Sequence, residues 1–521
     1  MKKKITTALL CFLTASLAFA GKTGGGMDIR ITVKGLENST MILANYYGDK
    51  QYVRDTVHFD SKGSVVFKSD QMHGSNPPKG DIYGTPGLLK CDSMIPGGVY
   101  LAVFPALGNR YFEFIIAEPQ FSIETDTIDM AKDLKIAGSQ ENKLFYDDMH
   151  FLQGNKTLSD SIAKLYKAAK DPAEKDKYRS QLQDIDKQVR EKRNSVMTQY
   201  PDLFYAKMLN AMKDITVPDA PKDANGKIID SAWQWRYYKT HYWDNVDLRD
   251  DRLLRCPVFH NKLKTFMTQT VVQIPDSINA GGDELIDKTD KKGEIYRYII
   301  TYIFNEMANS KVMGFDASYV HFGKKYFCAQ PTLTPWVDTA KTFKICDRVT
   351  RLEPVLVGKK AQKLILPSDS TENVWKSLYD IKAKYTILVF WDPDCGHCKK
   401  ELPVLADAYH DLKKKGVSVE GFGAAIMEME NYKAWEEFIK KNNLDWINVA
   451  DPHRHSNFRF EWDIQSTPQI YILDQDKVIR ARRIGADQVE DYILHLENPS
   501  YKGKLIKVND DDNQEGVEEK K

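Results

Sequence analysis

Two cysteines separated by two residues are the clearest chemical signal in this 521-residue sequence. Cys395 and Cys398 form a CGHC motif directly after the apolar run TILVFW at residues 386–391 and the short segment DPD. Cysteines at this spacing can ligate a metal, form a structural disulfide or carry out thiol–disulfide exchange. The elements around the motif decide which chemistry is available.

The motif stands where a buried strand is expected to give way to a helix. Cys395 then lies at the helix N-terminus, where unpaired N–H groups and the helix dipole stabilise a thiolate. Because only the thiolate is nucleophilic, this position favours Cys395 as the attacking group. Cys398 follows one turn later and can resolve a mixed disulfide. The pattern predicts a redox pair with these two roles.

The competing uses of the pair fit less well. Zinc usually takes four ligands, and the nearest additional candidates, His453 and His455, are expected to be loop histidines. A c-type haem site needs His after the second cysteine, where this chain has Lys399. A structural disulfide that closes two residues gains little loop entropy. We therefore expect no metal and no cofactor.

Strand and helix patterns alternate around the motif, which predicts an α/β domain over residues 346–500. A short strand in a connector and a helix near residues 372–382 are expected before the strand that precedes CGHC. The elements expected after it are a helix to about Lys415, a strand over 417–426, a helix over 431–442, a hairpin over 467–485 and a helix from Asp487. The acidic residues 501–521 are expected to form a disordered tail.

The segment VFWDPDCGHCKKELP resembles the active-site segment of the thioredoxin fold. Trp391 precedes the pair, Pro403 follows Cys398 by five residues, and Thr467-Pro468 resembles the family's cis-proline. With GADQVEDYI, the resemblance covers roughly residues 350–498. It is similar to the TlpA/ResA-type thiol–disulfide oxidoreductases of the bacterial envelope, in versions with an extra N-terminal β domain and a helical middle domain.

The resemblance implies roles for residues around the cysteines. Trp391 and Pro468 are expected to shape a substrate groove, and Thr467 is expected to offer its backbone to substrate across a cis peptide bond. It also implies protein thiol and disulfide substrates and a membrane thiol electron donor. The chain departs from thioredoxin at Val389, where that family has a buried acid six residues before the first cysteine. Which group deprotonates Cys398 is therefore open.

Gly396 and His397 separate the two cysteines, as in disulfide isomerases. An imidazolium at His397 can stabilise the Cys395 thiolate by charge and hydrogen bonding. Since this favours the reduced protein, we expect the pair to be a better oxidant than a Gly-Pro version.

The N-terminus is typical of a secretory signal. Lys2, Lys3 and Lys4 precede an apolar stretch, and Ala18-Phe19-Ala20 fits the small-x-small cleavage rule. The stretch is shorter than the about 20 residues of a membrane span. We expect a signal peptide over 1–20 and a periplasmic mature chain.

Two further regions are expected between the signal and the α/β domain. Period-two alternation predicts an antiparallel β sandwich over residues 21–138; the alternating residues are Ile29, Ile31 and Val33, Val99, Leu101 and Val103, Phe112, Phe114 and Ile116, and Phe121 and Ile123. Residues 139–345 are expected to be mainly helical, with a break at Asp171-Pro172. An apolar stripe on the second helix is expected to pack on its own domain, with a dimerising coiled coil as the alternative; it contains Tyr178, Leu182, Ile185, Val189 and Val196.

Four other cysteines remain in the mature chain: Cys91, Cys256, Cys328 and Cys346. They allow three pairings, which sequence cannot distinguish, and we expect them to be buried or structurally paired. The formal net charge of +1 disfavours nucleic-acid binding. The predicted function is thiol–disulfide exchange on envelope proteins through the CGHC centre. A peroxiredoxin-like peroxidase, and a binding protein with an accessory redox domain, are the alternatives, and the oligomeric state is left open.

Overall fold

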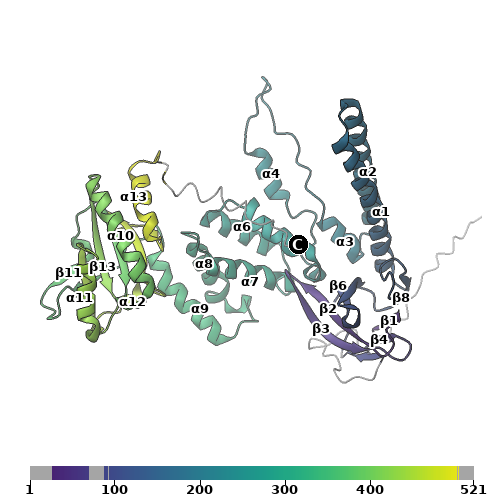
Figure 1. Cartoon of the computed structure of the whole chain (residues 1–521), viewed down its shortest axis with the longest axis horizontal. Coiled ribbons are helices and arrows are strands. Elements are labelled where there is room, and N and C mark those ends of the chain that lie inside the picture. The colour runs from purple at the N-terminus through teal and green to yellow at the C-terminus, as the bar shows by residue number, and fades with distance from the viewer. Residues whose placement is uncertain (1–25, 70–86, 92, 502, 504–521) are drawn as a thin grey trace, which may run out of the picture. The chain divides into compact units, whose positions relative to one another are not determined.

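The computed structural model describes residues 26–69, 87–91, 93–501 and 503 (Figure 1). The predicted signal peptide at residues 1–20 lies outside them, as does the predicted disordered tail apart from residues 501 and 503. The chain divides into two compact units, Met1–Leu263 and Lys264–Lys521. This division falls inside the region predicted to be one helical domain.

Two β-sheets pack face to face at the start of the first unit. One has the order β5-β4-β1-β8-β9 and the other the order β3-β2-β6-β7. The apolar faces of both sheets share one core, so the predicted β sandwich is confirmed. The strands are β1 Asp28–Lys34, β2 Thr40–Tyr47, β3 Lys50–His58, β4 Ser64–Lys68, β5 Leu88–Lys90, β6 Gly98–Phe104, β7 Arg110–Ile116, β8 Gln120–Asp126 and β9 Lys135–Ala137.

The strand directions in the sandwich differ in part from the prediction. The four-stranded sheet is antiparallel throughout. In the five-stranded sheet β1 pairs with β8 in parallel, as β4 does with β5, so the expectation of a wholly antiparallel sandwich is wrong there. The reason is topological, because the chain passes through six other strands between β1 and β8 and returns in the same direction.

The face of β6 that points into the sandwich also differs from the prediction. Tyr100, Ala102 and Phe104 join the shared core, whereas Val99 and Leu101 are buried on the opposite face. The short helix η2, Asp251–Arg255, packs on β6 and β2 in this unit. Because β6 is covered on both faces, its sequence is apolar throughout and carries no alternation that could set its register.

A long helical hairpin follows the sandwich. α1, Gln140–Ala168, ends just before Asp171, whose side chain caps α2, Pro172–Gln199, so the predicted break is confirmed. The apolar stripe on α2 is buried or half-buried in its own unit, with α1 and α3 packed beside α2. The remaining helices of the first unit are α3 Phe204–Ala211, α4 Trp233–His241 and α5 Pro257–Thr265, the last of which runs into the second unit.

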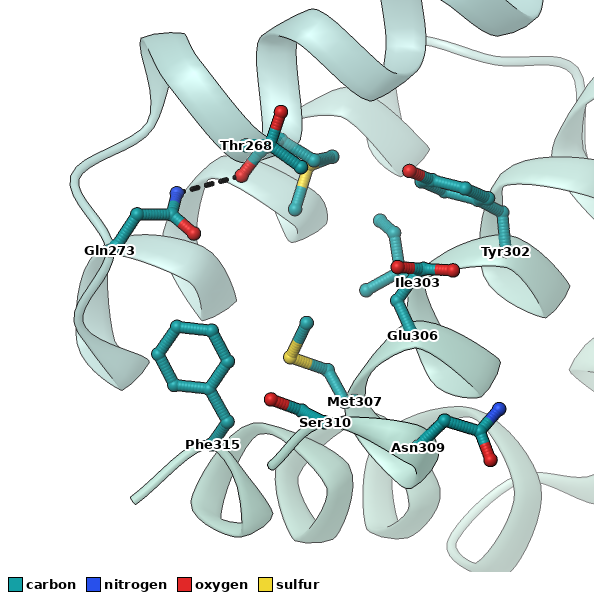
Figure 2. A pocket seen from close by; sticks show the side chains of 10 residues that line it. Thr268, Gln273, Tyr302, Ile303, Glu306, Met307, Asn309, Ser310 and Phe315 are labelled. Carbon is teal, nitrogen blue, oxygen red and sulfur yellow. Dashed lines mark hydrogen bonds between the residues drawn. The ribbon is translucent and has the colours of Figure 1, made fainter. Parts of the chain in front are cut away.

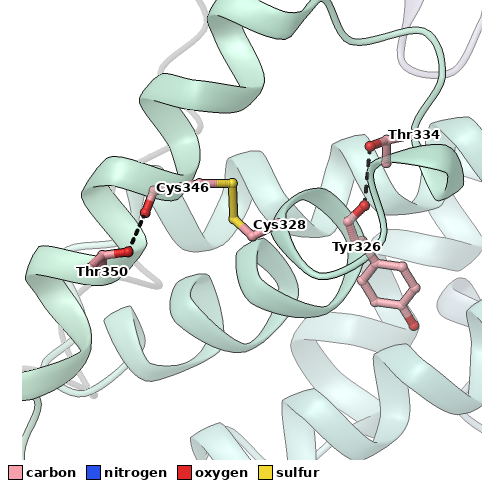
Figure 3. The surroundings of a disulfide bond; sticks show 5 residues. All are labelled: Tyr326, Cys328, Thr334, Cys346 and Thr350. Carbon is pink, nitrogen blue, oxygen red and sulfur yellow. Dashed lines mark hydrogen bonds between the residues drawn. A yellow bond between two sulfur atoms is a disulfide. The ribbon is translucent and has the colours of Figure 1, made fainter.

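The second unit begins with a helical part in which two cysteines are joined. Cys328 ends the π-helix η4, Gly323–Cys328, and forms a disulfide with Cys346 in α9, Thr339–Leu352 (Figure 3). This pairing fits the expectation of structural pairing and selects one of the possibilities that the sequence left open. The other elements here are the π-helix η3 Phe266–Thr270, α6 Pro275–Asp287, α7 Glu294–Asn309 and α8 Asp316–Phe322.

The C-terminal part of the second unit is a mixed sheet with helices packed on it, which confirms the predicted α/β fold. Its strand order is β14-β13-β12-β15-β16, with β12 in the centre. β12 pairs in parallel with β13 and antiparallel with β15. The elements are β10 Ile365–Pro367, β11 Trp375–Ser377, β12 Tyr385–Trp391, α10 Gly396–Lys414, β13 Val419–Ala425, α11 Tyr432–Lys441, β14 Ile447–Ala450, α12 Phe458–Glu461, β15 Gln469–Asp474, β16 Ile479–Arg482 and α13 Val489–Glu497.

The helix expected near residues 372–382 is reduced to a 3-10 helix, η7, at Leu378–Asp380. Residues 375–377 instead form β11, which pairs antiparallel with β10. Pairing with β10, which lies just upstream in the chain, thus overrides the helical pattern of these residues. Among the described residues, no helix combines the length and the apolarity needed to cross a bilayer.

Candidate redox site

The central strand and the following helix hold the CGHC motif between them. All seven residues of β12 are buried, because the strand has neighbours on both edges and is covered on both faces. Three residues, Asp392 to Asp394, then turn the chain into α10. Within this turn, the N–H of Asp394 donates to the Asp392 carboxylate over 2.8 Å and the N–H of Cys395 donates to the Asp392 carbonyl over 3.1 Å.

Cys395 is the N-cap of α10, as its position in the sequence predicts. Its sulfur accepts a hydrogen bond from the backbone N–H of Cys398 over 3.4 Å. The side chain is half-buried, so the sulfur is accessible while it contacts the helix start. Burial works against the thiolate, but hydrogen bonds from the Thr467 side chain and from the N–H groups of Cys398 and His397 outweigh it. Together they lower the pKa of Cys395 below the ordinary thiol value.

Cys398 has the opposite environment. It lies on the core side of α10, at the head of an apolar stripe that continues through Leu402, Leu405, Tyr409 and Leu412. Its side chain is fully buried, and this desolvation raises the pKa of Cys398 to about 12. The structure thus separates the two thiols into an accessible, acidic one and a buried, protonated one.

The loop before β15 completes the surroundings of Cys395. The peptide bond between Thr467 and Pro468 is cis, as predicted, and both residues are half-buried. The Cys395 thiol donates to the Thr467 carbonyl oxygen over 3.4 Å. A residue 72 positions away in the sequence therefore contacts the nucleophilic sulfur.

The remaining predicted site residues lie in different environments. Trp391 is fully buried, with its ring centroid 5.3 Å from that of Phe438, so it cannot line a groove open to protein substrates and the predicted groove role is wrong for this residue. The reason is that β12 is covered on both faces up to its last residue. Gly396 and the His397 side chain are exposed, and a Cβ at Gly396 would meet nothing within 4 Å.

A residue outside the predicted set, Asn431, contacts the turn before the cysteines. Asn431 donates from its side chain to the Asp394 carboxylate over 2.7 Å. Asn431 is the last residue of the 3-10 helix η8, Met429–Asn431, which follows β13 in the chain. Its place in the sequence, just beyond the strand expected over 417–426, was the only signal that could have indicated this contact.

The histidines weighed as metal ligands lie beside a carboxylate. His455 Nε2 lies 3.1 Å from a carboxylate oxygen of Glu372, and His453 Nε2 lies 4.0 Å from the other. Within the described ranges there is no cluster of three His, Cys, Asp or Glu side chains that could hold a metal.

A cavity of about 180 Å³ lies in the helical part of the second unit (Figure 2). It is formed by η3, α7 and the segment after α7, and Met267, Met307, Ile303 and Phe315 contribute apolar surface to it. No cysteine lines this cavity, so it does not belong to the redox site.

Comparisons with known proteins agree with this fold and chemistry. The AhpC/TSA family matches residues 357–482, and a domain of unknown function, DUF5106, matches residues 206–353. The thiol–disulfide oxidoreductase ResA of Bacillus cereus is 25% identical over 147 residues, which are 28% of this chain and 80% of that protein. The sporulation thiol–disulfide oxidoreductase A of Bacillus subtilis is 30% identical over 114 residues, which are 21% of this chain and 67% of that protein.

A solved domain of a possible thiol–disulfide isomerase from Cytophaga hutchinsonii is 38% identical, covers 28% of this chain and 96% of that domain, and has a TM-score of 0.25. The mixed sheet with a cysteine pair at the start of α10 defines a thioredoxin-like domain. The chain belongs to the thioredoxin-like thiol–disulfide oxidoreductases of the TlpA/ResA type. It is accordingly an oxidoreductase that acts on thiols and disulfides.

Proposed function

We propose that the chain exchanges disulfides with proteins of the cell envelope through its CGHC centre. The observation that carries the proposal is the contrast between the two thiols. Cys395 is half-exposed, and its sulfur is 3.4 Å from both the Cys398 N–H and the Thr467 carbonyl, whereas Cys398 is fully buried. A nucleophile in contact with solvent and a resolving thiol behind it are what stepwise exchange requires.

The reaction has two balanced steps. The Cys395 thiolate attacks one sulfur of a substrate disulfide, and the other substrate sulfur leaves as a thiolate. Cys398 then loses its proton and attacks the Cys395 sulfur, which releases the second substrate thiolate and leaves a Cys395–Cys398 disulfide. Because Val389 is apolar and buried, the proton of Cys398 passes to a different acceptor from the one thioredoxin uses.

The loop at Thr467 and Pro468 is the proposed contact for substrate backbone. Both residues are half-exposed, and the Thr467 carbonyl already lies beside the Cys395 sulfur. A substrate chain bound there would have its disulfide held at the nucleophile. Gly396 and His397 are exposed on the same helix start and are proposed to face the substrate as well.

The proposed location is the periplasm, with export directed by residues 1–20. The basic and apolar composition of this segment and its Ala18-Phe19-Ala20 site support this. A membrane thiol relay is the proposed electron donor. Determining the N-terminal residue of the chain recovered from a periplasmic extract tests the export step, and we expect it to be Gly21.

Insulin reduction by the purified mature chain, with dithiothreitol as the electron source, tests the exchange activity. We expect wild type to accelerate insulin precipitation and Cys395→Ser to be no faster than dithiothreitol alone. Parallel assays with hydrogen peroxide address the peroxidase alternative, which the thiol–disulfide oxidoreductases among the relatives do not favour. A chain that consumes peroxide but leaves insulin intact would refute the proposal.

A further inference from the structure

The loop that brings Thr467 and Pro468 to the redox site is irregular. Residues 463–468 lie between α12 and β15 and belong to no helix or strand, and residues 465–466 are exposed. The Thr467 carbonyl nevertheless lies 3.4 Å from the Cys395 sulfur. An irregular segment with an exposed middle has few contacts of its own, so its geometry depends on the residues that hold its two ends.

One hydroxyl group joins the two ends of this loop. The Tyr471 hydroxyl donates to the carbonyl of Trp462, just before the loop, over 3.0 Å. The same oxygen accepts a hydrogen bond from the side-chain amide of Gln469, just after the loop, over 2.6 Å. The Gln469 amide also donates to the Trp462 carbonyl over 3.4 Å. The residues on either side of the loop are therefore tied to each other through Tyr471.

This connection is buried among aromatic rings. Ile470 belongs to the core beneath α10, so its neighbours Gln469 and Tyr471 point to the other face of the sheet, where both are buried. The Tyr471 ring centroid lies 5.9 Å from that of Phe390 and 5.2 Å from that of Trp462. Polar groups that bond to one another in such surroundings fix one geometry, at a desolvation cost that apolar side chains would avoid.

Arg482 holds the same arrangement from the neighbouring strand. It stands opposite Tyr471 in the pairing of β15 with β16, and its guanidinium carbon lies 5.7 Å from the centroid of the Tyr471 ring. Its Nη2 lies 4.0 Å from a carboxylate oxygen of Asp463, the first residue of the loop. Arg482 also pairs with Asp316 of α8. The tyrosine and the start of the loop thus share one buried cation.

From these contacts we propose that Tyr471 is a positioning residue of the redox site. Its hydroxyl closes the loop 463–468 and thereby sets where Thr467 and Pro468 lie relative to the Cys395 sulfur. The inference rests on the proposed function, in which this loop receives substrate backbone beside the nucleophile. Without the hydroxyl the two ends of the loop can separate, which weakens substrate binding and the hydrogen bond from Thr467 that favours the thiolate.

Tyr471→Phe in the full mature chain tests the proposal, because it removes the hydroxyl and keeps the ring. We expect kcat/KM for insulin reduction to fall about tenfold, mainly through a higher KM, because substrate meets a displaced loop. The rate of iodoacetamide alkylation of Cys395 should rise at a higher pH than in wild type, because Thr467 no longer favours the thiolate. A hydroxyl that serves only stability would change neither quantity in the folded chain.

Tyr409→Phe is the matched control. Tyr409 is also fully buried, and its hydroxyl donates to Glu420 over 2.8 Å in the C-terminal half of α10, away from Cys395. Both variants should have lower urea midpoints than wild type, but Tyr409→Phe should keep the wild-type KM and alkylation profile. A wild-type KM and alkylation profile in Tyr471→Phe would overturn the proposal, as would equal changes in Tyr409→Phe.

Hydrogen exchange measures the loop directly. The amides of residues 463–468 should exchange faster in Tyr471→Phe than in wild type, while those of α10 should keep their rates. Gln469→Met removes the other partner of the hydroxyl and should change the exchange and the KM in the same direction. It decides the question if Tyr471→Phe does not fold. Wild-type exchange of the loop in the folded variants would overturn the proposal.

Insulin reduction by wild type separates this inference from the proposed function. A wild-type chain that does not reduce insulin refutes the proposed function itself. A wild-type chain that reduces insulin, with Tyr471→Phe and Gln469→Met equally active, refutes only the positioning role of Tyr471. Circular dichroism of each variant establishes that folded chains are compared.

Discussion

The sulfur of Cys395 lies 3.4 Å from the carbonyl oxygen of Thr467, a residue on a separate loop of the C-terminal sheet. It lies equally far from the N–H of Cys398 in its own helix. The thiol thus donates to one backbone group and accepts from another. When the proton leaves, the N–H contact strengthens because it becomes charge-assisted, and this favours the thiolate.

The roles of the two cysteines can be separated by trapping. Cys398→Ser should accumulate substrate proteins bonded to Cys395, because the thiol that releases them is gone. Cys395→Ser should accumulate none through the CGHC centre, since the other thiol of the pair, Cys398, is buried. The amount of mixed disulfide in each variant is measured by non-reducing electrophoresis after acid quenching. Equal trapping by both variants would contradict the assignment of Cys395 as the attacking thiol and Cys398 as the resolving thiol.

The reactivity of Cys395 should rise with pH, and this rise should occur at a lower pH than for a free cysteine. The pKa of Cys395 is lowered, so its thiolate fraction grows as pH rises through a midpoint below the ordinary thiol value. The pKa of Cys398 is raised to about 12, so this thiol stays protonated over the same range. The rate of iodoacetamide alkylation of Cys395 in Cys398→Ser, followed between about pH 5 and pH 9, should rise in one transition at a pH below that of a free cysteine. In Cys395→Ser, the peptide that contains Cys398 should stay nearly unalkylated throughout.

Substitutions of His397 distinguish its imidazole from its backbone. The sequence suggested that a protonated ring stabilises the Cys395 thiolate, but the groups that lower this pKa include the backbone N–H of His397. His397→Pro removes that N–H at a helix start, where proline is tolerated, and should raise the Cys395 pKa and make the reduction potential more negative. His397→Ala keeps the N–H and serves as the control. The Cys395 pKa of both variants is measured from thiolate absorbance against pH, and their reduction potentials from glutathione equilibration. A shift in His397→Ala as large as in His397→Pro would show that the imidazole ring, and not the backbone N–H, stabilises the thiolate.

Trp391 should matter for stability and not for substrate binding. Its indole is fully buried against Phe438, so Trp391→Phe leaves a gap in the core and should cost roughly 1–3 kcal/mol of unfolding free energy. Urea denaturation measures this loss. The KM for insulin should stay at the wild-type value under conditions where the variant is folded. A raised KM with unchanged stability would restore the groove role that the sequence suggested.

A buried arginine should stabilise the second unit. Arg482 in β16 is 1% exposed, pairs with Asp316 of α8 and lies 4.0 Å from the buried Asp463. Arg482→Met leaves both carboxylates without their buried cation and should cost about 3–5 kcal/mol. Arg480→Met is the matched control, because Arg480 is half-exposed and lies 3.9 Å from Asp474. Urea midpoints should fall in the first variant only; equal midpoints would show that the buried pair contributes nothing net.

The features that sequence determined are those set by local chemistry. The spacing of Cys395 and Cys398 after a strand placed one thiol at a helix start and the other one turn inside it, because a helix has the same geometry wherever it forms. Asp171-Pro172 separated α1 from α2 for a similar reason, since proline fits the first helical position and not the interior. Clean alternation in β1, β7 and β8 likewise fixed which residues face the core.

Tertiary structure decided what depends on contacts between separate elements. The all-apolar β6 had no alternation to orient it, residues 375–377 became a strand only because β10 lies beside them, and Trp391 was buried because the central strand is covered on both faces. Cys328 met Cys346, and not another cysteine, because η4 packs on α9. The Thr467 carbonyl reached Cys395 through the pairing of β15 with β12. Each of these contacts joins two separate elements, so its free energy is set by packing that the pattern of either element alone does not record.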